Sequence, residues 1–372
     1  MTRRWRVSAD TERSYEIRVA EPLLDLRNDA LLSKGNVPGR RFVIIDSGIR
    51  AQWQERLRRY FDAKEVEARY LAVPGGERSK NMEAVMSIVA ELRQYGVDRR
   101  NEPPIIMGGG ALLDTAGFAA SIYRRGVPFI RVPTTLLGYV DASVGVKTGV
   151  NVGSSKNLVG TFNAPELVLL DREFFGSLAP GEIASGLAEV LKLGLGCDAA
   201  LFRMLDAGAP AFASTRLRDA DGFKILARAI DVMLDQLQPN IYESDLSRPV
   251  DLGHTFSQAF EMLDDGSRVR HGEAVAFDLN LSAIISARRD ILGVDELREL
   301  ADLTRRLGLS TAVPDIEPQV VWESLIERTQ HRAGGQRTPL PRRIGDCVFV
   351  NDLARQEICD AFEELRDSHF HR

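Results

Sequence analysis

The sequence predicts an α/β N-terminal domain built on a parallel, doubly wound sheet, followed by a mostly α-helical C-terminal domain. In the first half, short apolar runs that end in glycine or aspartate alternate with segments of helical spacing, which is typical of such a sheet. After residue 178 almost every apolar stretch repeats with helical spacing. The 372 residues are enough for two domains, which we place at residues 1–178 and 179–372.

The N-terminal domain opens with two strand–helix pairs. Residues 41–49, RFVIIDSGI, form an apolar run that contains Asp46, and residues 51–63 have helical spacing. Residues 67–77, EARYLAVPGGE, predict a strand that ends in a Gly-Gly turn. Residues 81–96 then predict an amphipathic helix closed by a glycine.

The alternation continues to the end of this domain. Residues 103–110, PPIIMGGG, predict a short buried strand that runs directly into three glycines. A helix is expected over residues 111–123 and a further strand over residues 127–135.

The C-terminal domain is predicted from a series of helical stretches, which are residues 180–195, 220–237, 253–263, 271–292 and 294–309. A late segment, residues 338–353, has the composition of extended chain.

Composition excludes two classes of function. The formal net charge of -5 argues against a nucleic-acid-binding protein, which needs a basic excess to neutralise phosphates. No apolar run approaches the roughly 20 residues that cross a bilayer. The N-terminus has no apolar signal core, so we expect a cytosolic protein that does not bind membranes.

Lysine is scarce in this chain. The 48 basic residues are nearly all arginine, and the seven lysines are Lys34, Lys64, Lys80, Lys147, Lys156, Lys192 and Lys224. A coding bias toward arginine explains the ratio. Because the two side chains differ in donor geometry and in their ability to lose a proton, each lysine that remains is a more informative position.

The three glycines Gly108, Gly109 and Gly110 follow a predicted strand and precede a helix. Glycines at this edge of a parallel sheet let backbone N–H groups approach a pyrophosphate. The sequence G-x-G-x-x-G is absent, so a simple tight turn is the alternative. Asp46 stands at another strand end and is a candidate ribose ligand.

A metal site is a second candidate. His254 and His271 are seventeen residues apart, on predicted helices or their starts, and Glu189 lies on another predicted helix one turn before Lys192. Two histidines and one glutamate are the ligand set of an open catalytic zinc site. Core or surface histidines are the alternative, and the absence of H-E-x-x-H excludes a thermolysin-like protease.

Taken together, several stretches resemble the dehydroquinate synthase-like sugar phosphate cyclases. They are residues 108–157, SGLAEVLKLGL, GHTF and HGEAVA, and their order and separations match over about residues 40–350. The resemblance implies a Rossmann-like N-terminal domain, a helical C-terminal domain, bound NAD, one Zn²⁺ or Co²⁺ and a homodimer. It also implies transient oxidation of a sugar phosphate by NAD, elimination of phosphate, reduction and aldol closure of a carbocycle.

The resemblance carries over to individual positions. It implies that the metal ligands are Glu189, His254 and His271. It implies that the nucleotide is contacted by Asp46, Glu77, Lys80, Gly108, Gly109, Gly110, Asp114, Thr134 and Thr135. Substrate hydroxyls and phosphate are expected at Asp141, Lys147, Lys156, Asn157 and Lys192, with Lys147 and Lys156 also bordering the cofactor. Arg125 matches an arginine that reaches the substrate phosphate of the neighbouring subunit.

Departures from the dehydroquinate synthase pattern bear on the substrate. That enzyme's substrate carries a carboxylate, which meets a lysine and an arginine in the family pattern. Here no lysine follows Lys224, and the arginine position reads Ser247, with Arg248 one residue late. The asparagine of N-x-G-H is replaced by Asp251, and a second histidine by Gln258.

An aspartate at position 251 would repel a substrate carboxylate by about 4 kcal/mol at an effective dielectric constant of about 20. It would accept hydrogen bonds from hydroxyls instead, which favours sedoheptulose 7-phosphate. Asp251, Leu237 and His331 together resemble the 2-epi-5-epi-valiolone synthase subgroup.

Several alternatives stay open at this point. They are dehydroquinate synthase itself, with Arg248 as the cation, a 2-epi-valiolone or desmethyl-4-deoxygadusol synthase, a metal-dependent polyol dehydrogenase and a non-catalytic NAD-binding homologue. A surface histidine is the alternative for His331.

Overall fold

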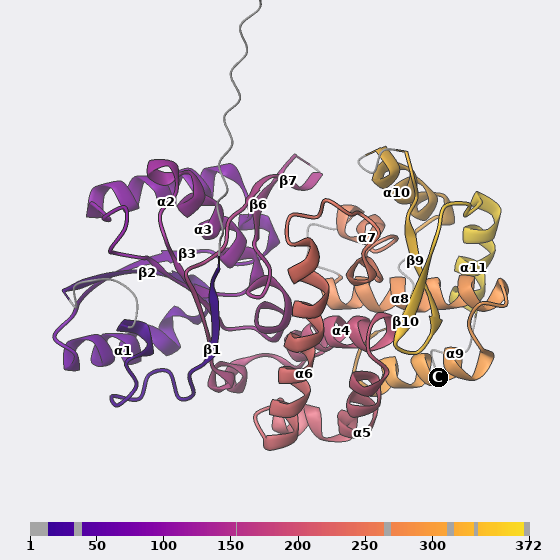
Figure 1. Cartoon of the computed structure of the whole chain (residues 1–372), viewed down its shortest axis with the longest axis horizontal. Coiled ribbons are helices and arrows are strands. Elements are labelled where there is room, and N and C mark those ends of the chain that lie inside the picture. Colours follow the sequence, from indigo (N-terminus) through magenta and orange to yellow (C-terminus); the bar gives the residue numbers. More distant parts are fainter. Residues whose placement is uncertain are drawn as a thin grey trace, which may run out of the picture.

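The computed structural model describes residues 14–32, 39–153, 155–263, 269–310, 316–330 and 334–367. Two domains lie side by side, one built around a sheet and one mostly helical (Figure 1). This is the predicted fold class. No helix in the described ranges combines the length and apolar character that spanning a bilayer demands. His331 falls outside the described residues.

The described residues form a six-stranded sheet in the order β1-β8-β5-β4-β2-β3, with every neighbouring pair parallel. Its strands are β1 (Glu16–Val19), β2 (Arg40–Asp46), β3 (Glu67–Val73), β4 (Ile105–Gly108), β5 (Ile130–Pro133) and β8 (Leu167–Leu170). All residues of β4, β5 and β8 are buried, as expected for central strands covered on both faces.

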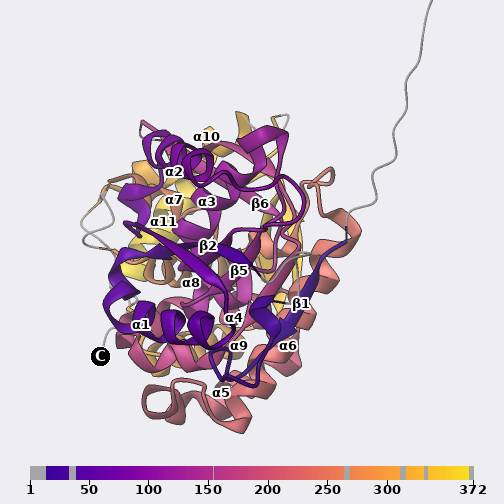
Figure 2. The ribbon, with the colours of Figure 1, turned by 90° about the vertical axis from the view of Figure 1, so that its left-hand side faces the viewer.

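Helices cover the two faces of this sheet (Figure 2). On one face α1 (Ser47–Ala63) buries Trp53, Leu57 and Phe61. On the other face lie α2 (Met82–Tyr95) and α3 (Gly110–Ile122). These strands and helices confirm the predicted alternation over residues 41–135. The edge strand β1 was not predicted, because four residues give too little pattern to recognise.

A hairpin of β6 (Lys147–Val152) and β7 (Ser155–Phe162) packs beside α3, on the side that faces the helical domain (Figure 1). Short helical turns connect the larger elements. They are η1 (Ala30–Leu32), η2 (Glu77–Ser79), η3 (Tyr123–Arg125), η4 (Gly138–Ala142), η5 (Arg172–Ser177), η6 (Gln238–Asn240) and η7 (Pro249–Asp251).

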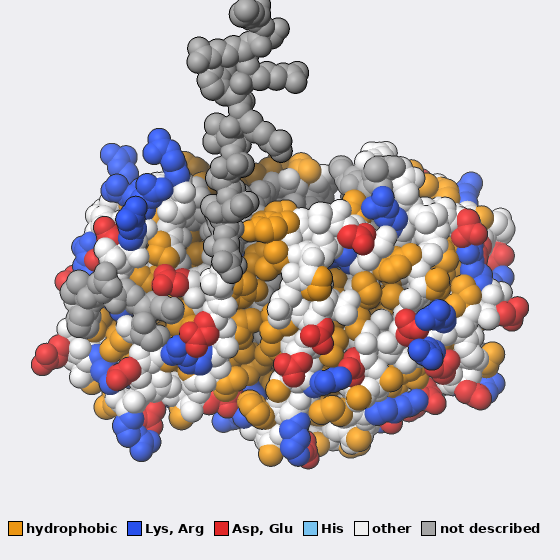
Figure 3. Space-filling model, in the orientation of Figure 1, with side chains coloured by type: hydrophobic (Ala, Val, Ile, Leu, Met, Phe, Trp, Pro, Cys, Tyr) orange, Lys and Arg blue, Asp and Glu red, His pale blue; other side chains and the backbone are white. Residues whose placement is uncertain are grey.

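The helical domain is built around α4 (Pro180–Gly196) and α8 (His271–Arg288), which are buried along almost their whole lengths. The helices packed around them are α5 (Ala199–Thr215), α6 (Ala220–Leu237), α7 (Gln258–Leu263), α9 (Val294–Arg306), α10 (Pro318–Gln330) and α11 (Arg355–Asp367). The predicted extended segment is an antiparallel pair, β9 (Thr338–Arg343) and β10 (Asp346–Val350). Apolar side chains gather along the middle of the molecule, where the two domains meet (Figure 3).

One predicted helix was wrong at its start. Helical spacing suggested a helix over residues 253–263, but α7 begins only at Gln258. The buried Asp278 carboxylate accepts hydrogen bonds from the backbone N–H groups of Phe256 and Ser257, which holds this stretch in an irregular turn. His254 therefore lies on a loop and not on a helix.

The two domains meet closely at Gly186 of α4. A Cβ atom there would lie 2.4 Å from Leu136 Cγ and 2.7 Å from the backbone nitrogen of Leu137. Leu136 and Leu137 lie in the turn that follows β5 at the carboxyl edge of the sheet. The absence of a side chain at Gly186 lets α4 approach this turn closely.

We expect Gly186→Ala to lower the free energy of unfolding by about 1–3 kcal/mol, because the added methyl group meets backbone that cannot move independently. Gly181→Ala in the same helix is the control, since its Cβ would meet only the guanidinium end of Arg270. Chemical denaturation monitored by circular dichroism measures both. Equal stability of the two variants would contradict the close approach.

Candidate active site

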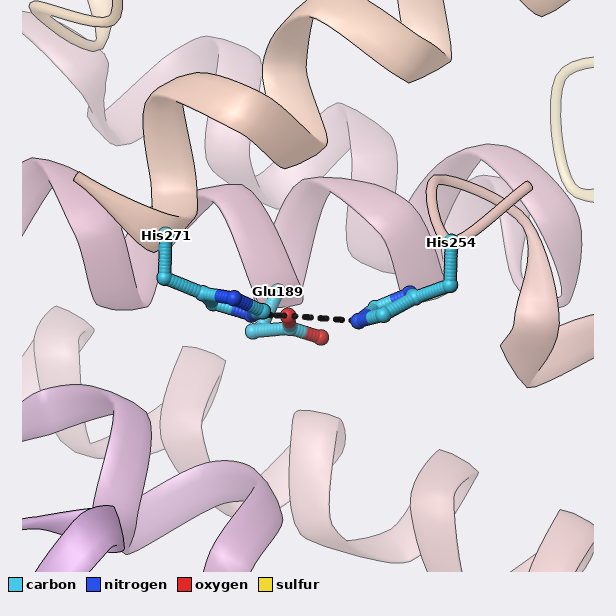
Figure 4. A group of neighbouring side chains, drawn as sticks. All are labelled: Glu189, His254 and His271. Carbon is cyan, nitrogen blue, oxygen red and sulfur yellow. Dashed lines mark hydrogen bonds and ion pairs between the residues drawn. The ribbon is translucent and has the colours of Figure 1, made fainter. Parts of the chain in front are cut away.

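A carboxylate and two imidazoles converge between α4, the loop after η7 and the first residue of α8 (Figure 4). Glu189 has no exposed surface, and its Oε1 lies 2.8 Å from His271 Nε2 and 3.5 Å from His254 Nε2. The two rings approach the carboxylate from opposite sides. The sequence-predicted trio is therefore brought together.

Separate contacts fix the two histidines. The backbone N–H of Gly272, next to His271, donates to Ser185 Oγ at 2.9 Å, and a Cβ at Gly272 would lie 2.3 Å from Ser185 Cα. The glycine thus lets the start of α8 touch α4. The carbonyl of His254 accepts a hydrogen bond from Arg328 of α10, so α4 and α10 anchor the two histidine-bearing segments.

Lys192 completes this cluster, with Nζ 2.5 Å from Glu189 Oε2 and only 3% of its side chain exposed. Burial alone would raise the pKa of Glu189, but Lys192 and the two imidazoles outweigh it and hold that pKa well below its ordinary value. Burial and the nearby Lys192 lower the pKa of His254. An ionised carboxylate beside a neutral imidazole is the form that binds metal ions.

The geometry fits a metal ion. One ligand atom from each of the three residues lies within 4.8 Å of the others. Tetrahedral zinc with ligand bonds of about 2.0–2.2 Å separates neighbouring ligand atoms by about 3.3–3.6 Å. The separation of 3.5 Å between Glu189 Oε1 and His254 Nε2 lies in that range, whereas that of 2.8 Å to His271 Nε2 is shorter, so His271 would have to move outward to suit Zn²⁺.

The carboxyl edge of the sheet forms a second cradle. Asp46, Gly108 and Thr134 stand at the ends of the neighbouring strands β2, β4 and β5. A Cβ at Gly109 would lie 3.1 Å from Thr135 Cγ2, and no side chain caps the start of α3 at Gly110. The Leu112 amide donates to the Gly109 carbonyl at 3.1 Å, so the amides of Gly110 and Ala111 are the candidate donors for an anion such as a pyrophosphate.

Three further residues predicted to contact the nucleotide, Glu77, Lys80 and Asp114, form contacts with other side chains. Lys80 is buried, and its Nζ lies 2.6 Å from Asp114 Oδ2. Glu77 Oε1 accepts a hydrogen bond from Asn151 Nδ2 at 2.8 Å. The first pair links the turn after β3 to α3, and the second links it to the β6–β7 hairpin.

A buried arginine that sequence reasoning missed fixes the loop between Asp141 and Lys147. Arg131 of β5 has no exposed surface, and it donates to the carbonyls of Ala142 at 3.0 Å, Gly145 at 2.6 Å and Lys147 at 3.1 Å. No short motif marks it, because an arginine in a buried strand is recognisable only when its acceptors are known.

Charged side chains form a chain across the domain boundary. Lys147 of β6 pairs with Glu243, and Glu243 also pairs with Arg248. Arg248 Nη2 lies 2.9 Å from Asp251 Oδ1, and Arg328 Nη2 lies 3.3 Å from Asp251 Oδ2. No motif in the sequence indicated Glu243 or Arg328.

These ion pairs correct the charge that the sequence predicted at Asp251. An unopposed negative charge was predicted at this position, but two arginines contact its carboxylate. Because both contacts are largely shielded from water, the repulsion expected for a substrate carboxylate is compensated locally. Asp251 alone therefore does not explain a preference for sugar phosphates without a carboxylate.

The remaining predicted residues lie around this chain. Lys156 and Asn157 are on β7, and the Asn157 N–H donates to Asn151 Oδ1 at 2.9 Å. Leu237 ends α6 and lies close to Gly145 in the loop that Arg131 holds. Arg125 is exposed in η3, and within the part of the chain that the structure describes no hydrogen bond or ion pair joins it to these residues.

A sheet with an open glycine cradle, joined to a helical domain that carries a carboxylate–imidazole trio, defines a two-domain enzyme of the nucleotide- and metal-binding class. Residues 70–185 match the family described as 3-dehydroquinate synthase N-terminal, and residues 186–331 match 3-dehydroquinate synthase C-terminal. The chain belongs to this family.

Several individual proteins are similar to this chain over nearly its whole length. A 2-epi-5-epi-valiolone synthase from Streptomyces hygroscopicus subsp. jinggangensis (strain 5008) is 41% identical over 95% of this chain and 87% of its own. Another, from Actinomyces sp., is 39% identical over 99% of both chains. A solved 2-epi-5-epi-valiolone synthase from S. hygroscopicus subsp. jinggangensis 5008 with NAD⁺ and Zn²⁺ bound has a TM-score of 0.93 at 40% identity, covering 97% of this chain and 99% of that one.

In metal-free protein, we expect Glu189→Gln to lower the free energy of unfolding by about 3–5 kcal/mol, because Lys192 would stay buried without its counter-charge. Adding Lys192→Met to this variant should recover part of the loss. Glu182→Gln, an exposed position on the same helix, should change stability by less than about 0.5 kcal/mol. Denaturant unfolding measures all three; a double variant no more stable than Glu189→Gln would exclude this explanation.

Proposed function

We propose that this protein converts sedoheptulose 7-phosphate to 2-epi-5-epi-valiolone and phosphate, with NAD and a divalent metal ion as cofactors. The observation that carries the proposal combines two features of one site. Glu189, His254 and His271 converge as metal ligands would, and nearby Arg248 is already paired with the carboxylates of Glu243 and Asp251. Similarity to 2-epi-5-epi-valiolone synthases over nearly the whole chain supports it.

Two groups of residues would bind the cofactors. Glu189, His254 and His271 would hold Zn²⁺ or Co²⁺, and the amides at Gly108–Gly110 would bind the pyrophosphate of NAD. The solved relative with NAD⁺ and Zn²⁺ supports this pair. When bound, the metal ion orients and polarises substrate hydroxyls, and NAD accepts and returns a hydride.

The chain's own side chains would bind and orient the sugar phosphate. Lys147 and Lys156 supply positive charge for the phosphate, which leaves as a dianion, and Asn157 donates hydrogen bonds. Asp141 and Asp251 accept hydrogen bonds from sugar hydroxyls. Holding these groups in place reduces the entropic cost of bringing the reacting atoms together.

Two features of organisation belong to this proposal. We place the domain boundary between residues 178 and 179, just before α4. We also propose a homodimer in which Arg125 reaches the substrate phosphate bound by the neighbouring subunit. Strand β7 packs beside α3, which precedes Arg125, and exposes the apolar side chains of Leu158, Val159 and Phe162, a surface that a second copy would cover.

A second candidate, 3-dehydroquinate synthase activity, is favoured by one observation. Arg248 and Arg328 lie together where a substrate carboxylate could be bound. Both arginines already contact internal carboxylates, and a substrate carboxylate would have to displace these. We therefore favour the seven-carbon sugar phosphate that carries no carboxylate.

The purified protein, supplied with NAD⁺ and Zn²⁺ or Co²⁺, should release phosphate from sedoheptulose 7-phosphate and form a cyclitol identified by NMR. The carboxylate substrate of 3-dehydroquinate synthase, assayed in parallel, should be a much poorer substrate. Lys147→Ala should abolish turnover and leave NAD⁺ binding intact. Turnover of the carboxylate substrate alone would refute the proposed function.

Mixing two inactive variants tests the dimer. Arg125→Ala and Lys147→Ala should each be inactive, but a heterodimer would contain one site with both native residues. After mixing and subunit exchange, about one quarter of wild-type activity should return, since half of the dimers carry one intact site of two. Activity that stays at the level of the separate variants would exclude a shared site.

A further inference from the structure

A loop residue supplies one member of the trio around Glu189. His254 lies between η7 and α7, and its N–H donates to the carbonyl of Asp251 at 3.0 Å. The preceding Gly253 has a φ of 80°, and a Cβ atom there would lie 3.0 Å from Val275 Cγ1 and 3.1 Å from Leu279 Cδ2. The loop therefore lies directly against α8, the helix that begins with His271.

A buried carboxylate of α8 holds the far end of this loop. Asp278 has no exposed surface, and its Oδ2 accepts hydrogen bonds from the N–H of Phe256 and, at 2.9 Å, from that of Ser257. Its Oδ1 accepts the hydroxyl of Ser282 at 3.0 Å. The two amides come just before α7, where a helix provides no acceptor for them, so Asp278 supplies the acceptor that buried N–H groups require.

The position of Asp278 on α8 relates this anchor to the second histidine. His271 is the first residue of the helix, and Asp278 follows seven residues later, which is about two helical turns and places both on one face. One rigid helix thus carries one imidazole and the anchor of the loop that carries the other. The two ring centroids lie 5.5 Å apart, on opposite sides of the Glu189 carboxylate (Figure 4).

Arg328 of α10 holds the same loop from another direction. It donates to the carbonyl of His254 and, at 2.9 Å, to Thr255 Oγ1, and it also pairs with Asp251. Because Arg328 contacts a residue proposed to bind the substrate, its removal would change two things at once. Asp278 reaches the loop through backbone amides, so its removal acts through the position of the loop itself.

We propose that Asp278 is a positioning residue for the metal site, which holds the loop at Phe256 and Ser257 so that His254 Nε2 faces Glu189. This inference rests on the proposed function and deepens it, since Glu189, His254 and His271 are the ligands proposed there. Residues that orient a metal ligand typically change metal affinity by about 10–100-fold when they are removed.

The test measures metal affinity on the full-length protein after its metal has been removed. Competition with a chromophoric chelator gives the dissociation constants of Zn²⁺ and Co²⁺. In Asp278→Ala both metals should bind at least tenfold more weakly, because the loop loses its anchor and His254 is no longer held toward Glu189. Asp278→Asn keeps an oxygen that can accept both amides and should stay within about threefold of wild type.

A spectrum provides a second measurement. The visible absorption of bound Co²⁺ reports the coordination geometry of the ion. It should change in Asp278→Ala and return toward the wild-type spectrum in Asp278→Asn. A residue that only stabilises the fold would leave the spectrum of the folded, Co²⁺-loaded protein unchanged.

The sheet domain offers a matched control. Asp171 is also a buried carboxylate that accepts two backbone N–H groups, those of Leu23 and Glu173, each at 2.7 Å. Asp171→Ala therefore removes the same kind of anchor from a place that holds no residue of the trio. It should leave the metal affinity within about twofold of wild type, and thermal melting compares the stability of the two alanine variants.

A milder variant replaces Asp278→Ala if thermal melting shows that protein to be unfolded. Ser282→Ala removes the hydroxyl that donates to Asp278 Oδ1 and lets the carboxylate turn away from the loop. The metal should then bind about threefold more weakly. An unchanged affinity in Ser282→Ala would in that case overturn the inference.

The outcomes separate the two proposals. If wild-type protein binds neither Zn²⁺ nor Co²⁺, the proposed function fails. If it binds them and Asp278→Ala keeps the wild-type affinity and Co²⁺ spectrum, the function stands and the role of Asp278 is refuted. An equal loss of affinity in Asp171→Ala would also refute it, since the effect would then be one of general destabilisation.

Discussion

The molecule is organised around one carboxylate that water cannot reach. Glu189 lies in the middle of α4, and a buried carboxylate is stable only if positive or polar groups surround it. Lys192 comes from the same helix, but His254 and His271 come from two other segments. Their convergence fixes the start of α8 and the loop after η7 relative to α4. The close contact at Gly186 then ties this assembly to the carboxyl edge of the sheet.

Much of the fold was predictable because its strands and helices bury regular apolar patterns. The alternation over residues 41–135 and the helices α4, α6, α8 and α9 follow from such patterns. The loop at His254 was not predictable, because its backbone is held by Asp278, a residue more than twenty positions later. The metal-type trio was found through motifs, whereas Glu243, Arg328 and Arg131 act through partners distant in sequence.

Asp251 shows how a substituted residue can mislead when it is considered alone. Its charge differs from that of the asparagine in the family pattern, and the sequence suggested simple repulsion. In the folded chain Arg248 and Arg328 compensate this charge, and Glu243 extends the pairing to Lys147 of the other domain. The electrostatic environment of this position therefore depends on the assembled network and not on one residue.

Arg131 has a consequence for anyone who wishes to redesign this enzyme. Its planar guanidinium reaches three carbonyls of one loop at once, a task that the single ammonium of a lysine could not perform with the same geometry. Libraries that diversify residues 141–147 for new sugars will keep a defined loop only if their backbones still offer those three oxygens. The buried Arg131 therefore limits which changes in residues 141–147 this loop can accept without losing its conformation.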